Sequence, residues 1–207
     1  MSSSEQSKNE TGCGFSDVKP LEVFEYPSQA SKIIWSVNSE NIIQISSQII
    51  ELITNNKIPI QMATYLIDTF SQMRVKDIKI FTELYQLVSN EFSYIVKPEN
   101  IRLATLLHYK GFKFENFEPK MTEEDVFNLY STESPLYYIV WDKVDELKSK
   151  FSNLDINQKI YETTPMDYAI IYGSELCFNY LKNLGAKYTN YSEEYAVQGG
   201  KKTFLCK

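Results

Sequence analysis

The sequence predicts an all-α fold, a helical solenoid in which an N-terminal helical region precedes repeated helix–turn–helix units. Along most of the 207 residues, apolar side chains recur at spacings of three and four, the period of a helix with one buried face. No segment alternates apolar and polar residues over the length that a strand needs. A pattern of hydroxyl residue, proline and apolar residue occurs twice, 30 residues apart, which favours a repeat architecture.

The chain ends and the cysteines suggest where the protein works. Residues 1–24 are rich in Ser, Glu, Lys, Asn and Gly, and we expect a flexible tail without a secretory signal. No run of residues approaches the ~18 apolar residues of a membrane span. Cys13, Cys177 and Cys206 are odd in number and far apart, unlike a disulfide framework. We therefore expect an intracellular, cytoplasmic protein, with Cys177 as a small core residue.

Residues 25–120 are expected to form the N-terminal helical region, with four amphipathic helices. Ser39 is placed to cap the first of these, Ile43 and Ile50 widen its apolar face, and prolines 59 and 98 begin the second and fourth. The four apolar stripes are Ile42, Ile45, Ile49, Leu52 and Ile53; Ala63, Leu66, Ile67, Phe70 and Met73; Ile78, Phe81, Tyr85, Val88, Phe92 and Ile95; and Ile101, Leu103, Leu106 and Leu107. Such stripes are more typical of a core than of a cofactor site.

Residues 121–207 are expected to hold the repeats, the last of them incomplete. Thr122 and Asp125 have the spacing of a capping box and open a helix. The segment that begins at Ser134-Pro135-Leu136 is then matched by the segment at Thr164-Pro165-Met166. A partial third copy, residues 192–200, follows 27 residues after Pro165.

The residues of the second copy suit a helical hairpin. Thr164 can cap the first helix, and Pro165 occupies a first-turn position where its missing N–H costs nothing. Ala169 lets a neighbouring helix approach, while Gly173 and Gly185 can adopt the positive φ that ends each helix. These residues are expected to shape the helical hairpin rather than to take part in catalysis.

The stretch "TPMDYAIIYG", followed by Gly185-Ala186, resembles an ankyrin repeat. Asp167 stands where that family usually has His, Ile170 replaces the second Ala, and Lys143 takes the glycine place in the first copy. The wider arrangement resembles trichomonad ankyrin-type proteins that carry a domain of unknown function. The resemblance covers residues 120–207 well, whereas residues 26–119 resemble the family only in their general helical pattern.

The resemblance implies a non-enzymatic protein–protein interaction module with an extended concave surface. Its motif positions name a candidate partner-binding surface of Tyr138, Trp141, Asp142, Tyr161, Glu162, Tyr168, Ile171 and Tyr172. Aromatic residues are frequent interface anchors, but they serve equally in cores, so these side chains face either an unknown protein partner or the N-terminal helices. The alternative function is a structural or regulatory helical scaffold, oligomeric or not, without a dedicated ligand groove.

No catalytic, metal or cofactor site is expected. The single histidine, His108, is interpreted as a satisfied or surface residue, because nothing marks a Ser or Cys as its partner. One His and three distant Cys lack the spacing of zinc ligands, and there is no glycine-rich phosphate loop. A net charge of −6 without a basic stripe argues against nucleic acid as a partner.

Overall fold

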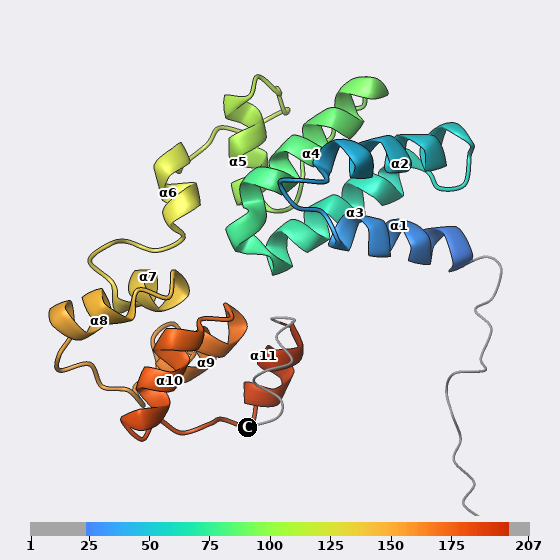
Figure 1. The fold of residues 1–207 in the computed structure, drawn as a ribbon. Coiled ribbons are helices and arrows are strands. Elements are labelled where there is room, and N and C mark those ends of the chain that lie inside the picture. The colour runs from blue at the N-terminus through green and yellow to red at the C-terminus, as the bar shows by residue number, and fades with distance from the viewer. Residues whose placement is uncertain (1–23, 199–207) are drawn as a thin grey trace, which may run out of the picture.

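The computed structural model describes residues 24–198, and within that range the chain forms eleven α-helices, one short 3-10 helix and no strand (Figure 1). The predicted all-α class is therefore confirmed. One isolated antiparallel bridge joins Ile160 and Thr163. None of the helices in this range is both long and apolar enough to cross a membrane.

The helices fall into two groups, each around its own core (Figure 1). We call residues 24–128 the N-terminal lobe and residues 130–198 the C-terminal lobe. The N-terminal lobe contains α1 (Glu25–Trp35), α2 (Ile42–Thr54), α3 (Ile60–Met73), η3 (Val75–Asp77), α4 (Ile78–Glu91), α5 (Ile101–Tyr109) and α6 (Glu123–Asn128). The C-terminal lobe contains α7 (Pro135–Val140), α8 (Val144–Lys150), α9 (Pro165–Ile171), α10 (Glu175–Asn183) and α11 (Ser192–Gln198).

The apolar stripe on α4 forms the centre of the N-terminal core. Four of its predicted members are buried, namely Ile78, Phe81, Tyr85 and Val88. The helix ends at Glu91, before the last two predicted members, and Ile95 is more than half exposed. The end is local: Ser93 has φ 51°, and the N–H of Tyr94 donates to the carbonyl of Ser89, a turn that stops a helix.

Helix α3 begins directly after Pro59 as predicted, but other helix starts in this lobe differ from the prediction. The first helix, α1, is not among the four that the apolar stripes predict. Ser39 does not cap α2; the side chain of Asn38 instead accepts hydrogen bonds from the N–H groups of Glu40 and Asn41, just before the helix. Asn and Ser side chains can both accept hydrogen bonds from the same backbone N–H groups near a helix start. Apolar periodicity therefore does not show which of two neighbouring polar residues will do so.

Helix α6 connects the two lobes in the chain but packs with the first. The predicted capping box is confirmed, because Thr122 and Asp125 exchange both of its hydrogen bonds. Val126 is fully buried in the N-terminal core. The predicted domain boundary at residue 120 assigns α6 to the repeats, whereas Phe127 of α6 still packs in the N-terminal core and Tyr130 is the first residue of the C-terminal core.

The C-terminal lobe consists of two helical hairpins, α7–α8 and α9–α10, followed by α11. Helix α9 packs against both α7 and α11. Thr164 caps α9 as predicted, Ser134 caps α7 in the corresponding position, and Gly173 and Gly185 have φ of 62° and 88°. Cys177, predicted to be a core residue, is fully buried.

The turn of the first hairpin corrects one prediction. The residue with positive φ is Asp142, at 55°, rather than Lys143, which the constant spacing of the two copies places opposite Gly173. The shift arises because α7 has six residues and α9 has seven. Aspartate is among the residues that tolerate this conformation, so the first turn forms without a glycine.

Candidate functional site

The predicted surface residues lie in two places in the C-terminal lobe. Tyr161 and Glu162 are exposed on a loop before α9. The other six residues lie on α7 and α9 or at their ends, and Tyr138 and Tyr168 are buried.

The loop before α9 is a tight hairpin whose two-residue turn is Tyr161-Glu162. Ile160 and Thr163 donate backbone hydrogen bonds to each other's carbonyls, at 2.9 and 3.2 Å. Both turn residues have positive φ, 48° and 67°, as in type I′ turns, where Asn-Gly is the favoured pair. Tyr161 projects with 78% of its surface exposed. The hairpin is tied to the helix behind it, because the hydroxyl of Tyr168 donates to the carbonyl of Ile160 at 3.1 Å.

Three tyrosine rings meet over the first helices of the hairpins. The rings of Tyr168 and Tyr172 stack with their centroids 6.3 Å apart, and Tyr130 meets both edge-on. The hydroxyls of Tyr130 and Tyr172 are 3.3 Å apart. Tyr130 belongs to the segment that leads into the lobe, so the chain itself covers part of the predicted surface.

A strained turn at Leu129 aims Tyr130 at this cluster. Leu129 has φ 62° and ψ −42°, and the N–H of Tyr130 donates to the carbonyl of Asn128 at 2.7 Å. Such three-residue turns with positive φ are rare and strained for a residue with a side chain. The guanidinium of Arg102 on α5 donates to the carbonyl of Leu129 at 3.3 Å and holds the turn from the N-terminal lobe.

Lys76 of the N-terminal lobe lies on the surface formed by Trp141 and Tyr172. Its ammonium donates to the backbone carbonyl of Tyr172 at 3.0 Å, and it lies 5.7 Å from the ring centroid of Trp141 and 6.0 Å from that of Tyr172. The indole N–H of Trp141 donates to the carbonyl of Asn128 at 3.2 Å. Substantial helix–helix packing within the described chain is confined to each lobe, so these contacts help to join the two.

Two of the predicted residues hold the lobe together. The hydroxyl of Tyr138 donates to the carbonyl of Thr132 and accepts a hydrogen bond from Lys150 at 2.6 Å. The carboxylate of Asp142 accepts hydrogen bonds from the N–H groups of Leu176 and Cys177, at 3.1 and 2.8 Å. Their polar groups are thus already engaged within the chain. Ile171 is half-buried at the end of α9.

The environment of the tyrosines changes their acidity. Burial raises the pKa of both Tyr168 and Tyr172 well above the usual value, and the neighbouring Tyr130 adds to both effects. Arg102 acts on Tyr172 in the opposite direction. Both tyrosines therefore keep their protons at neutral pH and act as hydrogen-bonding and aromatic groups rather than as acids or bases.

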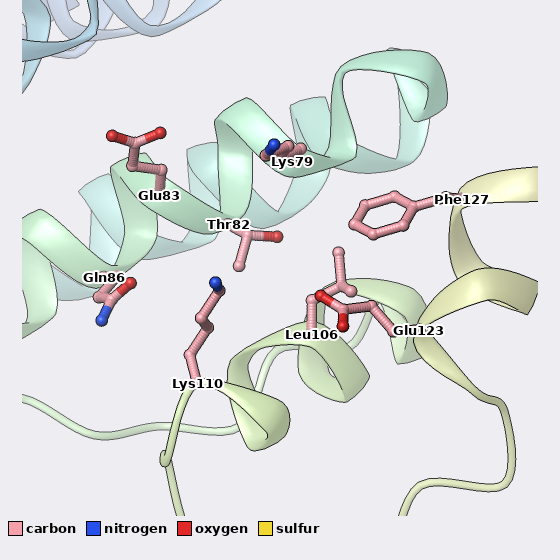
Figure 2. Close-up of a pocket in the computed structure, with 8 residues that line it drawn as sticks. All are labelled: Lys79, Thr82, Glu83, Gln86, Leu106, Lys110, Glu123 and Phe127. Atoms are coloured by element: carbon pink, nitrogen blue, oxygen red, sulfur yellow. The ribbon is translucent and has the colours of Figure 1, made fainter.

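The N-terminal lobe has a separate depression of about 230 Å³ between α4, α5 and α6 (Figure 2). In Figure 2 Lys110 reaches from the end of α5 toward Thr82 on α4. Its lining residues are Lys79, Thr82, Glu83, Gln86, Leu106, Lys110, Glu123 and Phe127. They combine charged, polar and apolar groups, and the hydroxyl of Thr82 donates to the backbone carbonyl of Ile78 at 2.7 Å.

His108 does not fit its prediction fully. It is half-buried, and its Nδ1 is buried without a hydrogen-bond partner. Its ring meets those of Tyr109 and Phe117 edge-on, which is a packing role. Within residues 24–198, no cluster of three or more His, Cys, Asp or Glu side chains is placed to hold a metal ion. Cys13 and Cys206 lie outside the described residues.

Searches against family models, curated proteins and solved structures found no match to this chain.

Proposed function

We propose that the chain is a non-enzymatic protein-interaction module built from ankyrin-like repeats, with the Tyr161-Glu162 turn as its principal contact. The observation that carries the proposal is the exposure of Tyr161, 78%, on a turn that is fixed by two backbone hydrogen bonds. Rigidly displayed aromatic side chains are the commonest anchors of protein interfaces.

The conformation of this turn supports a binding role. A residue with a side chain held in the left-handed region costs on the order of 1 kcal/mol, and two adjacent ones, Tyr161 and Glu162, are present here. An Asn-Gly pair would form the same turn at lower cost. Strained residues of this kind concentrate at functional sites, where their side chains matter more than local stability.

Several features of the C-terminal lobe support the ankyrin-like interpretation. Both hairpins begin with a capped Ser-Pro or Thr-Pro pair, and a two-residue turn projects before α9. Asp167, which stands at the usual His position, also has a structural role: it accepts hydrogen bonds from Thr164, Thr189 and Ser192. The bonds from Thr189 and Ser192 connect the second hairpin to α11, as expected of stacked units.

The test is partner capture with matched tyrosine variants. Affinity purification from the native cell with the wild-type chain identifies a partner, and its Kd is then measured with the purified proteins. Tyr161→Asn suits the turn and removes the aromatic ring, so binding should weaken at least about tenfold while the melting temperature does not fall. Tyr65→Asn, at a residue 64% exposed on α3, is the control and should bind like the wild type. Equal affinity of Tyr161→Asn and wild type would overturn the proposal.

A further inference from the structure

We propose that the surface formed by Trp141 and Tyr172 binds a lysine side chain of a basic partner segment, and that Lys76 is the intramolecular occupant of this site. The inference rests on the proposed function, because it assumes a protein partner. It adds the chemistry of that partner and a second contact surface, distinct from the turn at Tyr161.

The geometry around Lys76 matches the needs of a primary ammonium group. The Nζ atom has an oxygen acceptor at 3.0 Å, the carbonyl of Tyr172, and two aromatic rings at 5.7 and 6.0 Å. Rings at this distance attract a cation through their negative faces. The carbonyl belongs to the residue that ends α9, where helix carbonyls lack an intrahelical donor and the helix dipole is negative.

The surface has a chemical preference that follows from these groups. An ammonium group combines a compact charge with three rotatable donors, so it can bond one carbonyl and still contact both rings. An acetylated lysine has lost its charge and the attraction to the rings. We therefore expect lysine to bind and acetyl-lysine not to bind.

The present occupant is tethered and can be displaced. Lys76 lies on η3, a three-residue turn of the N-terminal lobe, and substantial helix packing within the described chain does not cross between the lobes. Small interfaces of this kind permit relative motion of two lobes. When Lys76 leaves, Trp141 and the carbonyl of Tyr172 become available to another cation.

Charge favours a basic partner. In residues 130–198, acidic side chains outnumber lysines, and the whole chain has a net charge of −6. An acidic lobe attracts a basic segment and repels an acidic one, which affects both association rate and partner choice. The occupant that the observations favour is thus a lysine in a basic segment of another protein.

Competition with Lys76 makes a quantitative prediction. A ligand that binds only when the site is vacant has its apparent affinity reduced by the fraction of vacant sites. If Lys76 leaves the site vacant in roughly one molecule in ten, the apparent affinity for an external lysine is reduced about tenfold. Removing the ammonium of Lys76 should therefore tighten binding of that lysine by about tenfold. Lys76→Met keeps the length of the side chain and removes the charge.

The experiment is an NMR titration of the full chain with three blocked pentapeptides, Ac-Gly-Gly-Lys-Gly-Gly-NH₂ and its acetyl-lysine and arginine versions. The chain has only two tryptophans, so the indole N–H signal of Trp141 is readily assigned with Trp141→Phe. In Lys76→Met the lysine peptide should shift this signal with a Kd about tenfold lower than in the wild type. The arginine peptide should bind more weakly than the lysine peptide, and the acetylated peptide should produce no shift. Lys79→Met, at an exposed lysine on α4, should behave as the wild type.

The outcomes separate this inference from the proposed function. If Lys76→Met is folded and the lysine peptide leaves the Trp141 signal unchanged, or if the acetylated or arginine peptide shifts it equally, the inference is overturned. The wild-type titration provides a second measurement in case Lys76→Met does not fold, because the same signal should move at higher peptide concentration. Neither titration involves Tyr161, so partner capture through the turn succeeds or fails independently.

Discussion

The carboxylate of Asp142 lies over the first turn of α10 and accepts a hydrogen bond from the N–H of Cys177 at 2.8 Å. Its other oxygen accepts one from the N–H of Leu176. Ser174, the residue before α10, makes no side-chain cap, and its hydroxyl donates to the carbonyl of Val140. A residue of the first hairpin thus caps the second, and this bond joins the two hairpins.

Asp142→Gly should lower the free energy of unfolding by about 1–2 kcal/mol, the usual value of a helix cap. Glycine keeps the positive φ that this position needs, so the loss isolates the carboxylate. Asp142→Asn retains an acceptor and tolerates the same conformation, so it should lose less. Urea unfolding followed by circular dichroism measures both variants. Equal stability of Asp142→Gly and wild type would show that water replaces the cap.

The buried carboxylate of Asp167 gives a second stability prediction. It is 2% exposed and accepts hydrogen bonds from three hydroxyls, those of Thr164, Thr189 and Ser192. Asp167→Ala leaves three hydroxyls without their acceptor and should cost about 2–4 kcal/mol. Asp167→Asn keeps one acceptor oxygen and should lose less.

Hydrogen exchange locates this effect. Because Thr189 and Ser192 precede or begin α11, the amides of that helix should lose protection before those of α10 in Asp167→Ala. A uniform loss of protection across the C-terminal lobe would contradict a local role of Asp167 at α11.

The tyrosine cluster predicts loss of stability at alkaline pH. Burial, followed by the bond to Tyr130, raises the pKa of Tyr172 above its usual value of about 10. The folded state therefore holds a proton that the unfolded state releases above about pH 10, so stability is retained below that pH and declines above it. The slope is at most about 1.4 kcal/mol per pH unit for each such tyrosine.

Tyr172→Phe should make this decline shallower, because the difference in bound protons between the folded and unfolded states falls by up to one. Urea midpoints measured from pH 8 to pH 11 test the difference in slope. Tyr168 and Tyr85, whose pKa values are also raised by burial, keep a residual slope in the variant. Identical slopes in wild type and variant would mean that Tyr172 ionises normally in the folded chain.

Local signals predicted the C-terminal hairpins well. The cap at Thr164, the left-handed Gly173 and the capping box at Thr122 each depend on neighbouring residues, so the sequence alone reveals them. The left-handed Asp142 was missed, because a constant spacing between two copies cannot detect that one helix is a residue shorter.

The contacts that cover the candidate surface were not predictable in the same way. Lys76 and Tyr172 are 96 residues apart, and no periodic pattern relates them. Tyr130 reaches the cluster through a positive φ at Leu129, a residue type that gives no signal for such a conformation. Whether aromatic residues face a core or a partner depends on tertiary packing of this kind.

The turn before α9 should become more stable when its two strained residues are replaced. Replacing Tyr161-Glu162 by Asn-Gly supplies the pair that type I′ turns prefer, and should stabilise the chain by about 1 kcal/mol. For a chain of this size that corresponds to a rise of about 2–4 °C in melting temperature. The exposed pair of Lys159 and Glu162, 3.9 Å apart, is lost in the variant, but exposed pairs contribute little. Differential scanning calorimetry measures the change, with Tyr65→Asn as the exposed control. A lower melting temperature would mean that the ring of Tyr161 stabilises the fold, whereas a rise combined with weaker partner binding would show that the turn retains its strained residues for recognition.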